Sequence, residues 1–201
     1  MPRNKERNQK IKEERREQIL STALMLFTRK GLAAAKITDI AAAANISQGL
    51  MYHYYKSKEE IFTELVRIGF ARMNEACRWL VSQPLSPREK IKLAVEELLK
   101  LLEQNEDAAR YHFLIAQATA SEAIPAEAKN IIKEENEFPY EAIAGIMAEG
   151  QEEGSIKSYA ARELAMIFWS SINGLAIYKA VHDDEFKAPD AAILTSMFFV
   201  K

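Results

Sequence analysis

The fold of this chain is decided by residues 37–55, which read Ile37-Thr38-Asp39-Ile40-Ala41-Ala42-Ala43-Ala44-Asn45-Ile46-Ser47-Gln48-Gly49-Leu50-Met51-Tyr52-His53-Tyr54-Tyr55. The isoleucines and alanines of the first half recur at helical spacing and predict a short helix with one apolar face. Asn45 tolerates the positive φ with which a chain often leaves a helix, and Ser47 is a favourable N-cap for a second helix. Two short helices about three residues apart predict a helix-turn-helix.

The second of these helices is predicted to expose a surface suited to duplex DNA. Helical spacing places Met51 and Tyr55 on its inner face, so most of its other side chains point outward. Glutamine can form two hydrogen bonds to adenine, and tyrosine and histidine bond phosphates or contact thymine methyl groups. Gly49 lets the backbone approach DNA near a helix N-terminus, where free N–H groups attract phosphate. Burial of any single tyrosine in the core is the alternative interpretation.

Four groups of residues at fixed offsets carry a family resemblance. They are Ile19-Leu20 with Ala23, Phe27 and Gly31; Thr38-Asp39-Ile40-Ala41; Ile46-Ser47-Gln48-Gly49; and Met51-Tyr52-His53-Tyr54-Tyr55-Lys56-Ser57-Lys58-Glu59. Through this pattern residues 16–62, about a quarter of the chain, resemble the DNA-binding domain of the tetracycline-repressor (TetR) family of bacterial transcription regulators.

The resemblance implies contacts with DNA at the matching positions. The predicted DNA-binding residues are Lys36, Thr38, Gln48, Gly49, Leu50, Tyr52, His53, Tyr54, Lys56 and Lys58. Residues 48–50, His53 and Tyr54 would face the major groove, and Tyr52 and Lys58 would bond phosphates. Lys36 stands where the family often has a capping Ser or Thr, and would supply a phosphate contact instead.

The rest of the chain reads as further helices. The first runs from Glu6 to Lys30, with residues 1–16 frayed or disordered at its start, and Gly31 ends it. Two later helices are predicted to begin at capping boxes, Ser57–Glu60 and Ser86–Glu89, and a third to cover Asp107 to Ala118. A further helix is predicted from Pro125 toward Glu153, with a kink or break at Pro139. The last two are predicted to follow a cap at Ser158 and to begin at Pro189. With about nine helices and no strand, the expected fold is all-α. Residues 1–57 form the helix-turn-helix DNA-binding domain, and residues 58–201 form a helical effector-binding and dimerisation domain.

The resemblance also implies a small-molecule cavity and a homodimer in the second domain. The candidate cavity residues are Trp79, Arg110, Tyr111, His112, Phe113, Phe138 and Trp169, with plain core packing as the alternative for each aromatic. Residues 164–178 are apolar on almost every face, and the chain end at residues 193–200 is apolar as well, which favours burial against a second subunit. The candidate interface residues are Ser170, Gly174, Tyr178 and Met197, and an internal core helix is the alternative.

Composition and charge exclude several other classes of protein. A single cysteine among 201 residues rules out an internal disulfide, and the polar N-terminus does not read as a secretory signal. The apolar stretch Leu164–Tyr178 is shorter than the roughly 18 residues of a membrane span. Residues 1–60 hold 12 Lys and Arg against 7 Asp and Glu, whereas the remainder holds 15 against 22. A basic segment on an acidic body suggests contact with a polyanion, and solvated helix faces are the alternative.

No pattern typical of a catalytic or metal site is present. The three histidines and one cysteine lack metal-ligand spacing, no phosphate-binding or nucleophile motif occurs, and Asp183-Asp184-Glu185 falls in a predicted loop. We therefore expect no enzyme activity, no cofactor and no metal. Outside the DNA-reading helix, the basic residues Arg3, Lys5, Arg7, Lys10 and Lys12 either follow the minor groove or form a solvated tail.

The sequence thus predicts a cytoplasmic, ligand-responsive repressor. It would bind a palindromic operator as a homodimer and be released by a small apolar or amphipathic effector. Two alternatives remain open: an effector-independent architectural or cell-division DNA-binding protein of the same fold, and a helical protein-interaction module that never binds DNA.

Overall fold

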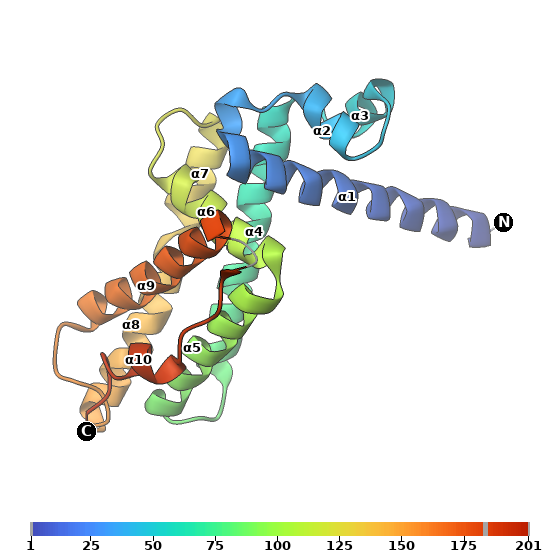
Figure 1. Ribbon diagram of the computed structural model, residues 1–201. Coiled ribbons are helices and arrows are strands. Elements are labelled where there is room, and N and C mark those ends of the chain that lie inside the picture. Colours follow the sequence, from blue (N-terminus) through green and yellow to red (C-terminus); the bar gives the residue numbers. More distant parts are fainter. Residues whose placement is uncertain (1, 183–184, 201) are drawn as a thin grey trace.

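The computed structural model describes residues 2–182 and 185–200, with side chains from residue 7 onward. Its helices are α1 (Pro2–Ala34), α2 (Ile37–Ala43), α3 (Gln48–Tyr54), α4 (Lys58–Ser82), α5 (Pro87–Gln104), α6 (Glu106–Thr119), α7 (Ala126–Glu135), α8 (Glu137–Glu152), α9 (Ala161–His182) and α10 (Ala191–Thr195) (Figure 1). The predicted all-α fold is confirmed. Within the described ranges, β pairing is limited to an isolated bridge between Ile156 and Phe199. The side chains of Arg3 and Lys5, and the predicted loop at Asp183 and Asp184, lie outside the described residues.

Helix α1 is longer at its N-terminus than the sequence indicated. It is helical from Pro2, whereas a frayed start was expected over residues 1–16. Ion pairs one turn apart support this segment: Lys10 Nζ lies 3.8 Å from Glu14 Oε1, and Arg16 Nη1 lies 3.1 Å from Glu13 Oε1. Gly31 was predicted to end this helix; it instead kinks α1, which continues to Ala34, and its φ of 75° suits a residue without a Cβ.

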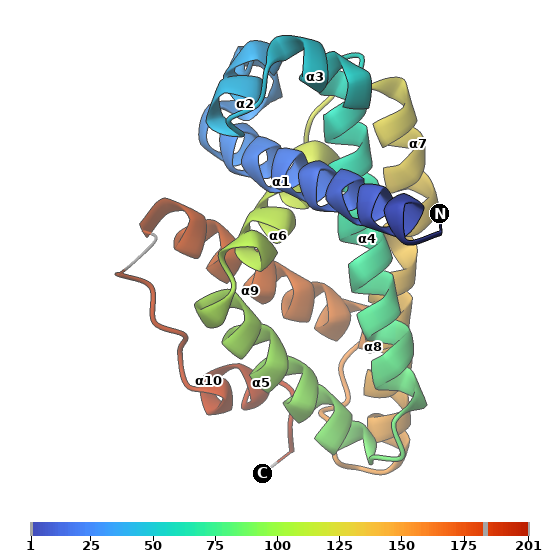
Figure 2. The same ribbon diagram turned by 90° about the vertical axis from the view of Figure 1, so that its right-hand side faces the viewer.

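The predicted helix-turn-helix is present as α2 and α3. Asn45 has a φ of 51°, as expected for the residue that leads out of α2. The Ser47 hydroxyl accepts a hydrogen bond from the Leu50 N–H at 3.2 Å and so caps α3. Figure 2 shows α2 and α3 together at one end of the molecule, above α1.

The two predicted capping boxes differ in the structure. Ser86 and Glu89 form the complete reciprocal box at the start of α5. At the start of α4, the Ser57 hydroxyl accepts from the Glu60 N–H as predicted, but the Glu60 carboxylate accepts from the Lys56 N–H at 2.7 Å instead of from Ser57. The carboxylate therefore also fixes the chain that joins α3 to α4.

The helix expected from Pro125 toward Glu153, with a kink or break at Pro139, is broken into two helices. The chain breaks at Asn136, between α7 and α8, and Pro139 lies in the first turn of α8. A proline ring clashes with the carbonyl four residues earlier, here that of Glu135, so α7 has to end there. Gly154 ends α8 with a φ of 73°, as predicted. Helix α9 begins at Ala161, so Ser158 does not cap it.

Two hydrophobic clusters divide the interior. The first joins α1–α3 and the N-terminal half of α4 to α6 and α7, and the second joins the C-terminal half of α4 to α5, α8 and α9. Helix α4 belongs to both clusters and runs along the molecule from one to the other (Figure 2). Packed side chains of α4 and α6 therefore connect the body to the helix-turn-helix.

Helix α9 is 22 residues long and, by length and composition, apolar enough to cross a membrane. It is thus longer than the apolar stretch predicted from the sequence. In the structure it packs against α6 and α8 and buries Phe168, Trp169 and Ile172. The core helix of a globular protein passes the same criterion, so the length of α9 alone does not indicate a membrane span.

Candidate DNA-binding interface and effector cavity

Helix α3 is anchored by two side chains and exposes the others. Met51 and Tyr55 are 1% and 3% exposed and join the first hydrophobic cluster. On the outer side, Tyr52 is 52% exposed and Leu50 is 38% exposed, and Gln48, Gly49 and His53 are exposed as well. A Cβ at Gly49 would meet no atom within 4 Å, so its backbone is open to an approaching ligand.

The other predicted DNA contacts are less uniform in exposure. Lys36 and Lys56 are exposed, and Lys36 caps α2 without a side-chain hydrogen bond, as expected for a lysine. Thr38 is half-buried in the first turn of α2. Tyr54 is half-buried against the first cluster, with its ring centroid 5.7 Å from that of His53 in an edge-on arrangement. Tyr54 is therefore partly a core residue.

Lys58 is engaged within the protein. Its ammonium group donates hydrogen bonds to the main-chain oxygens of Leu32, Ala33 and Ala35, at 2.8, 2.9 and 2.8 Å. An ammonium has three donors, so this set uses all of them. Lys58 thereby ties the start of α4 to the segment between α1 and α2, and a phosphate contact from this side chain would have to replace one of these bonds.

A second polar contact joins α1 to α4, the two helices on which the helix-turn-helix packs. Arg16 of α1 forms an ion pair with the half-buried Glu64 of α4. Tyr55 lies beside this pair, and burial raises the pKa of its hydroxyl well above the ordinary value. The phenol therefore stays uncharged, and α1, α3 and α4 meet at one rigid junction.

The body contains a cavity of about 450 Å³ between α4, α5, α6, α8 and α9. Four of the predicted residues line it: Trp79, Tyr111, His112 and Trp169. Three do not: Arg110, Phe113 and Phe138. Arg110 instead pairs with Glu106 and Asp107, one turn earlier on its own helix, at 2.6 and 3.0 Å. The ring of Phe138 packs beneath the Arg78 guanidinium, 5.3 Å away.

Most of the cavity wall was not foreseen from the sequence. It is largely aliphatic and includes Met73, Leu98, Leu101 and Ile115. Leu98 belongs to the apolar stripe of α5, which predicts burial but cannot distinguish a cavity wall from packed core. Arg72 and Glu97 are the charged residues of the wall within the described ranges, and both are exposed.

Two titratable groups of the cavity wall are shifted toward their uncharged forms. Burial lowers the pKa of His112 below 6.5, and a hydrogen bond to Asn173 opposes this shift only in part. Burial raises the pKa of the Cys77 thiol to about 12, so this cysteine is a thiol rather than a reactive thiolate. The inner wall is therefore electrically neutral at pH 7. Within the described ranges, no group of three or more His, Cys, Asp or Glu is placed to hold a metal ion.

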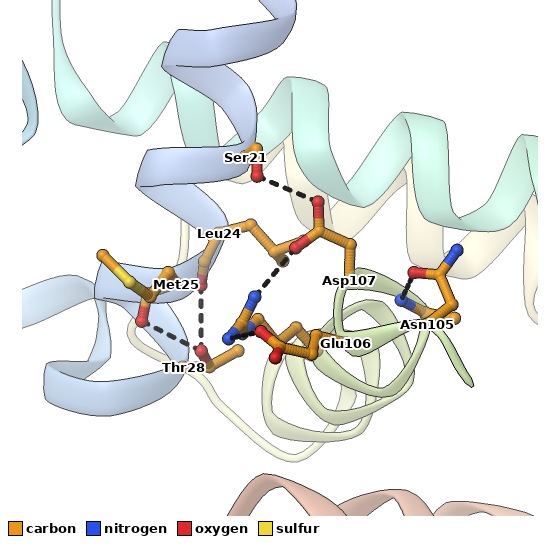
Figure 3. A network of polar contacts seen from close by, with 9 residues as sticks. Ser21, Leu24, Met25, Thr28, Asn105, Glu106 and Asp107 are labelled. Carbon is orange, nitrogen blue, oxygen red and sulfur yellow. Dashed lines mark hydrogen bonds and ion pairs between the residues drawn. The ribbon is translucent and has the colours of Figure 1, made fainter. Parts of the chain in front are cut away.

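The cavity is joined to the DNA-binding helices at the start of α6. Figure 3 shows this junction, where the Ser21 hydroxyl of α1 donates to Asp107 Oδ2 of α6 at 2.9 Å. The other oxygen of Asp107 accepts from Arg110 at 3.0 Å. Asn105, which lines the cavity, caps the same turn by accepting from the Ala108 N–H. One helical turn thus contacts both the cavity and α1.

Three of the four predicted interface residues lie on α9. Ser170, Gly174 and Tyr178 are exposed, along a face that also presents Met166, Ile177 and Val181. A Cβ at Gly174, or at the exposed Gly145 of α8, would meet no atom within 4 Å. Met197 instead follows α10, which packs against α5, and the neighbouring Phe198 is buried against Phe168. Part of the apolar chain end is therefore covered by its own subunit.

Comparison with known proteins gives consistent matches. The family model described as bacterial regulatory proteins, tetR family, matches residues 19–65. The transcriptional repressor KstR2 of Rhodococcus jostii (strain RHA1) is 29% identical over 154 residues, which are 77% of this chain and 74% of that protein. Among solved structures, the MbdR regulator from Azoarcus sp. CIB matches with a TM-score of 0.78 at 22% identity, over 90% of this chain and 95% of that one. The ketosteroid transcriptional regulator KstR2 of Mycobacterium tuberculosis matches with a TM-score of 0.73 at 21% identity, over 93% and 96%.

Proposed function

This chain belongs to the TetR family of bacterial transcriptional regulators, which are not enzymes, and from this premise we propose that it is a ligand-responsive repressor. It acts in the cytoplasm and binds a palindromic operator as a homodimer, and a small apolar or amphipathic effector releases it. Residues 1–57 are the DNA-binding unit, and residues 58–201 bind the effector and the second subunit.

The observation that carries this proposal is the outer face of α3. A helix that buries only Met51 and Tyr55 leaves Gln48, Tyr52 and His53 exposed together. We assign Gln48, Gly49, Leu50 and His53, with the edge of Tyr54, to the major groove, and Tyr52, Lys36 and Lys56 to phosphates, with Thr38 at an adjacent position. Lys58 contributes mainly by positioning α4, because its ammonium is already engaged.

A homodimer presents two copies of α3 on one side of the duplex. Their half-sites are expected about one helical turn apart, roughly 34–36 Å. The exposed face of α9, with Ser170, Gly174 and Tyr178, is assigned to the contact between subunits. The dimer can adopt a conformation that fits the operator and one in which the two α3 helices are spaced differently. An effector that binds the second conformation more tightly weakens operator binding, by an amount set by its difference in affinity for the two conformations.

The cavity favours an effector-responsive regulator over an effector-independent DNA-binding protein. A volume of about 450 Å³ lies within the range of small-molecule sites, and packed cores rarely leave so much space unfilled. The cavity also reaches Asn105, in the turn that contacts α1. A ligand that moves this turn therefore acts directly on the helix beneath α2 and α3.

A gel-shift titration with DNA from the promoter region of the chain's own gene tests the proposal. We expect a specific complex whose affinity falls steeply with salt, because cationic lysine side chains neutralise phosphates and release their counterions. Tyr52→Ala should weaken binding to all sequences alike, and Gln48→Ala should change base preference at one position of each half-site. Tyr159→Ala, at a 64% exposed site outside both assigned surfaces, is the matched control. A folded protein whose Tyr52 and Gln48 variants both bind like the parent would contradict the assignment.

A further inference from the structure

The inner end of the cavity has one polar group whose hydrogen-bonding role can be worked out. His112 of α6 lines the cavity, and its Nδ1 lies 3.3 Å from Oδ1 of Asn173 in α9. The imidazole ring also stacks on Trp169, with centroids 6.5 Å apart and an interplanar angle of 29°. Two residues of α9 therefore fix the orientation of this ring.

The contact with Asn173 determines which nitrogen carries the proton. An amide oxygen only accepts hydrogen bonds, so Nδ1 of His112 is the donor and holds the ring proton. In a neutral imidazole the other nitrogen, Nε2, is then unprotonated and accepts. No hydrogen-bond partner of Nε2 occurs among the described residues. A ligand in this cavity thus meets a hydrogen-bond acceptor at its inner end.

We infer that the ligand of this cavity is an uncharged, largely apolar alcohol or phenol whose hydroxyl group donates a hydrogen bond to Nε2 of His112. The inference rests on the proposed function, because it takes this ligand to be the effector. A hydroxyl is the simplest uncharged group that supplies the missing donor. The aliphatic wall, with Met73, Leu98 and Ile115, covers the apolar remainder of the molecule.

The charge distribution of the wall argues against a charged group at the inner end. Burial keeps His112 neutral, and the Trp169 indole N–H is already used by the Pro139 carbonyl at 3.0 Å. The charged wall residues, Arg72 and Glu97, are exposed and have opposite signs, and the Arg72 guanidinium lies over the Tyr111 ring, 4.9 Å from its centroid. A carboxylate beside His112 would therefore be buried without a cation, which is strongly unfavourable.

A second cavity, of about 210 Å³, gives the ligand additional room. It lies on the other side of His112 and Trp169, which line both spaces together with Met73 and Ile115. Its own wall is more polar and includes Thr119, Asn136 and Asn173. The polar groups shared by or adjacent to the two spaces are thus gathered around His112, which suits a molecule with its polar end near this residue.

The two tryptophans of the chain make the inference directly measurable. Trp79 and Trp169 are the only ones in the sequence, and both line the larger cavity. Quenching or a spectral shift of their fluorescence therefore reports occupancy in the free protein, without DNA. The probes are decyl alcohol, methyl octyl ketone and decanoate, which have the same number of carbon atoms and differ in the polar end.

We expect decyl alcohol to bind the wild-type protein several-fold more tightly than the ketone and at least about tenfold more tightly than decanoate. His112→Phe keeps an aromatic ring but removes the acceptor, and should reduce the affinity for the alcohol by roughly fivefold with little effect on the ketone. Asn173→Leu removes the amide oxygen that accepts from Nδ1, so either ring nitrogen of His112 can carry the proton. This variant should lose the preference for alcohol over ketone. This second variant keeps the test decisive if His112→Phe is unstable.

Three results would overturn the inference: tighter binding of the ketone, tighter binding of decanoate, or no binding of any probe to a folded protein. The promoter gel shift separates these results from failure of the proposed function. Alcohol binding that depends on His112 but leaves the DNA complex intact supports the ligand class and contradicts the effector role. Absence of a promoter complex contradicts the repressor and leaves the ligand result unaffected.

Discussion

The ammonium of Lys58 lies against three main-chain oxygens at the C-terminal end of α1 and in the link between α1 and α2. The partial negative charge of a helix C-terminus adds to the attraction of these carbonyls for a cation. Lys58 therefore holds α4 against the segment that positions the helix-turn-helix. Its neighbour Lys56 is exposed, and its backbone N–H donates a hydrogen bond to Glu60.

Lys58 and Lys56 allow a matched comparison between a lysine that positions α4 and a lysine that contacts DNA directly. Lys58→Met should lower the free energy of unfolding by about 1–3 kcal/mol, because charged hydrogen bonds to half-buried carbonyls are lost. Lys56→Met should leave stability within about 0.5 kcal/mol and weaken DNA binding only. Urea unfolding and a gel shift on both variants measure the two effects. Equal stabilities for the two variants would show that Lys58 has no positioning role.

His112 should make stability depend on pH. Burial lowers its pKa in the folded chain below the ordinary 6.5. Between the folded and unfolded pKa values the unfolded chain binds a proton and the folded chain does not, so stability falls as the pH drops below about 6.5. Below the folded pKa the loss stops growing.

This contribution is measured by comparing variants in urea at pH 7.5 and pH 5.5. The wild-type protein should lose more stability between these two values than His112→Phe, which has no group to protonate at this position. His53→Phe, at an exposed site on α3, is the matched control and should follow the wild-type protein. The same loss for all three proteins would mean that the ring of His112 is not held neutral by burial.

Among the elements, α6 contacts both the cavity and α1, as α4 also does. Its middle carries Tyr111, His112 and Ile115 on the cavity side, and its first turn meets α1 through Asp107. A helix is stiff along its axis, so a shift of the middle of α6 is passed to this first turn. The contact of Ser21 with Asp107 is where such a shift first reaches α1 (Figure 3).

A double-mutant cycle on this contact measures how firmly α6 is joined to α1. Ser21→Ala and Asp107→Ala should each destabilise the protein, and the double variant should lose about 0.5–1 kcal/mol less than the sum of the two. Urea unfolding of the four proteins gives the coupling energy. If the two losses of unfolding free energy are additive, the connection between the cavity and α1 lies elsewhere, most directly along α4.

At the scale of the whole molecule, we expect the exposed face of α9 to form the contact between subunits. Gly174 lies in the middle of that face and leaves open space where a side chain would begin. A glycine within a helix costs about 1 kcal/mol relative to alanine, and close approach of another helix is a physical reason to accept that cost. Two copies related by a two-fold axis would meet at this point.

Gly174→Arg should therefore convert a dimer into a monomer without unfolding the chain. The single chain has room for the new side chain, whereas a second subunit does not. Size-exclusion chromatography with light scattering measures the mass, and circular dichroism checks that the helices are retained. Gln104→Arg, at an exposed site at the end of α5, should remain dimeric. A dimeric Gly174→Arg variant would move the interface away from α9.

The sequence alone determined the features that depend on residues close together in the chain. The positive φ of Gly31 and of Asn45 and the Ser47 cap follow from local backbone preferences, so the helix-turn-helix and its outward surface were predictable. The pairing of Arg110 with Glu106 and Asp107 is equally local, being one turn along a helix, although the sequence analysis had placed Arg110 in the cavity. Local signals also located α5 and the end of α8.

The tertiary structure alone decided which side chains share a space. The wall of the cavity comes from α4, α5, α6, α8 and α9, and apolar periodicity reports only that a residue turns inward, not whether it meets packed atoms or an opening. The engagement of Lys58, the tautomer of His112 and the coverage of Phe198 depend on partners more than 20 residues away in the chain. Contacts between distant segments are fixed only when whole helices pack, because no local backbone preference specifies them.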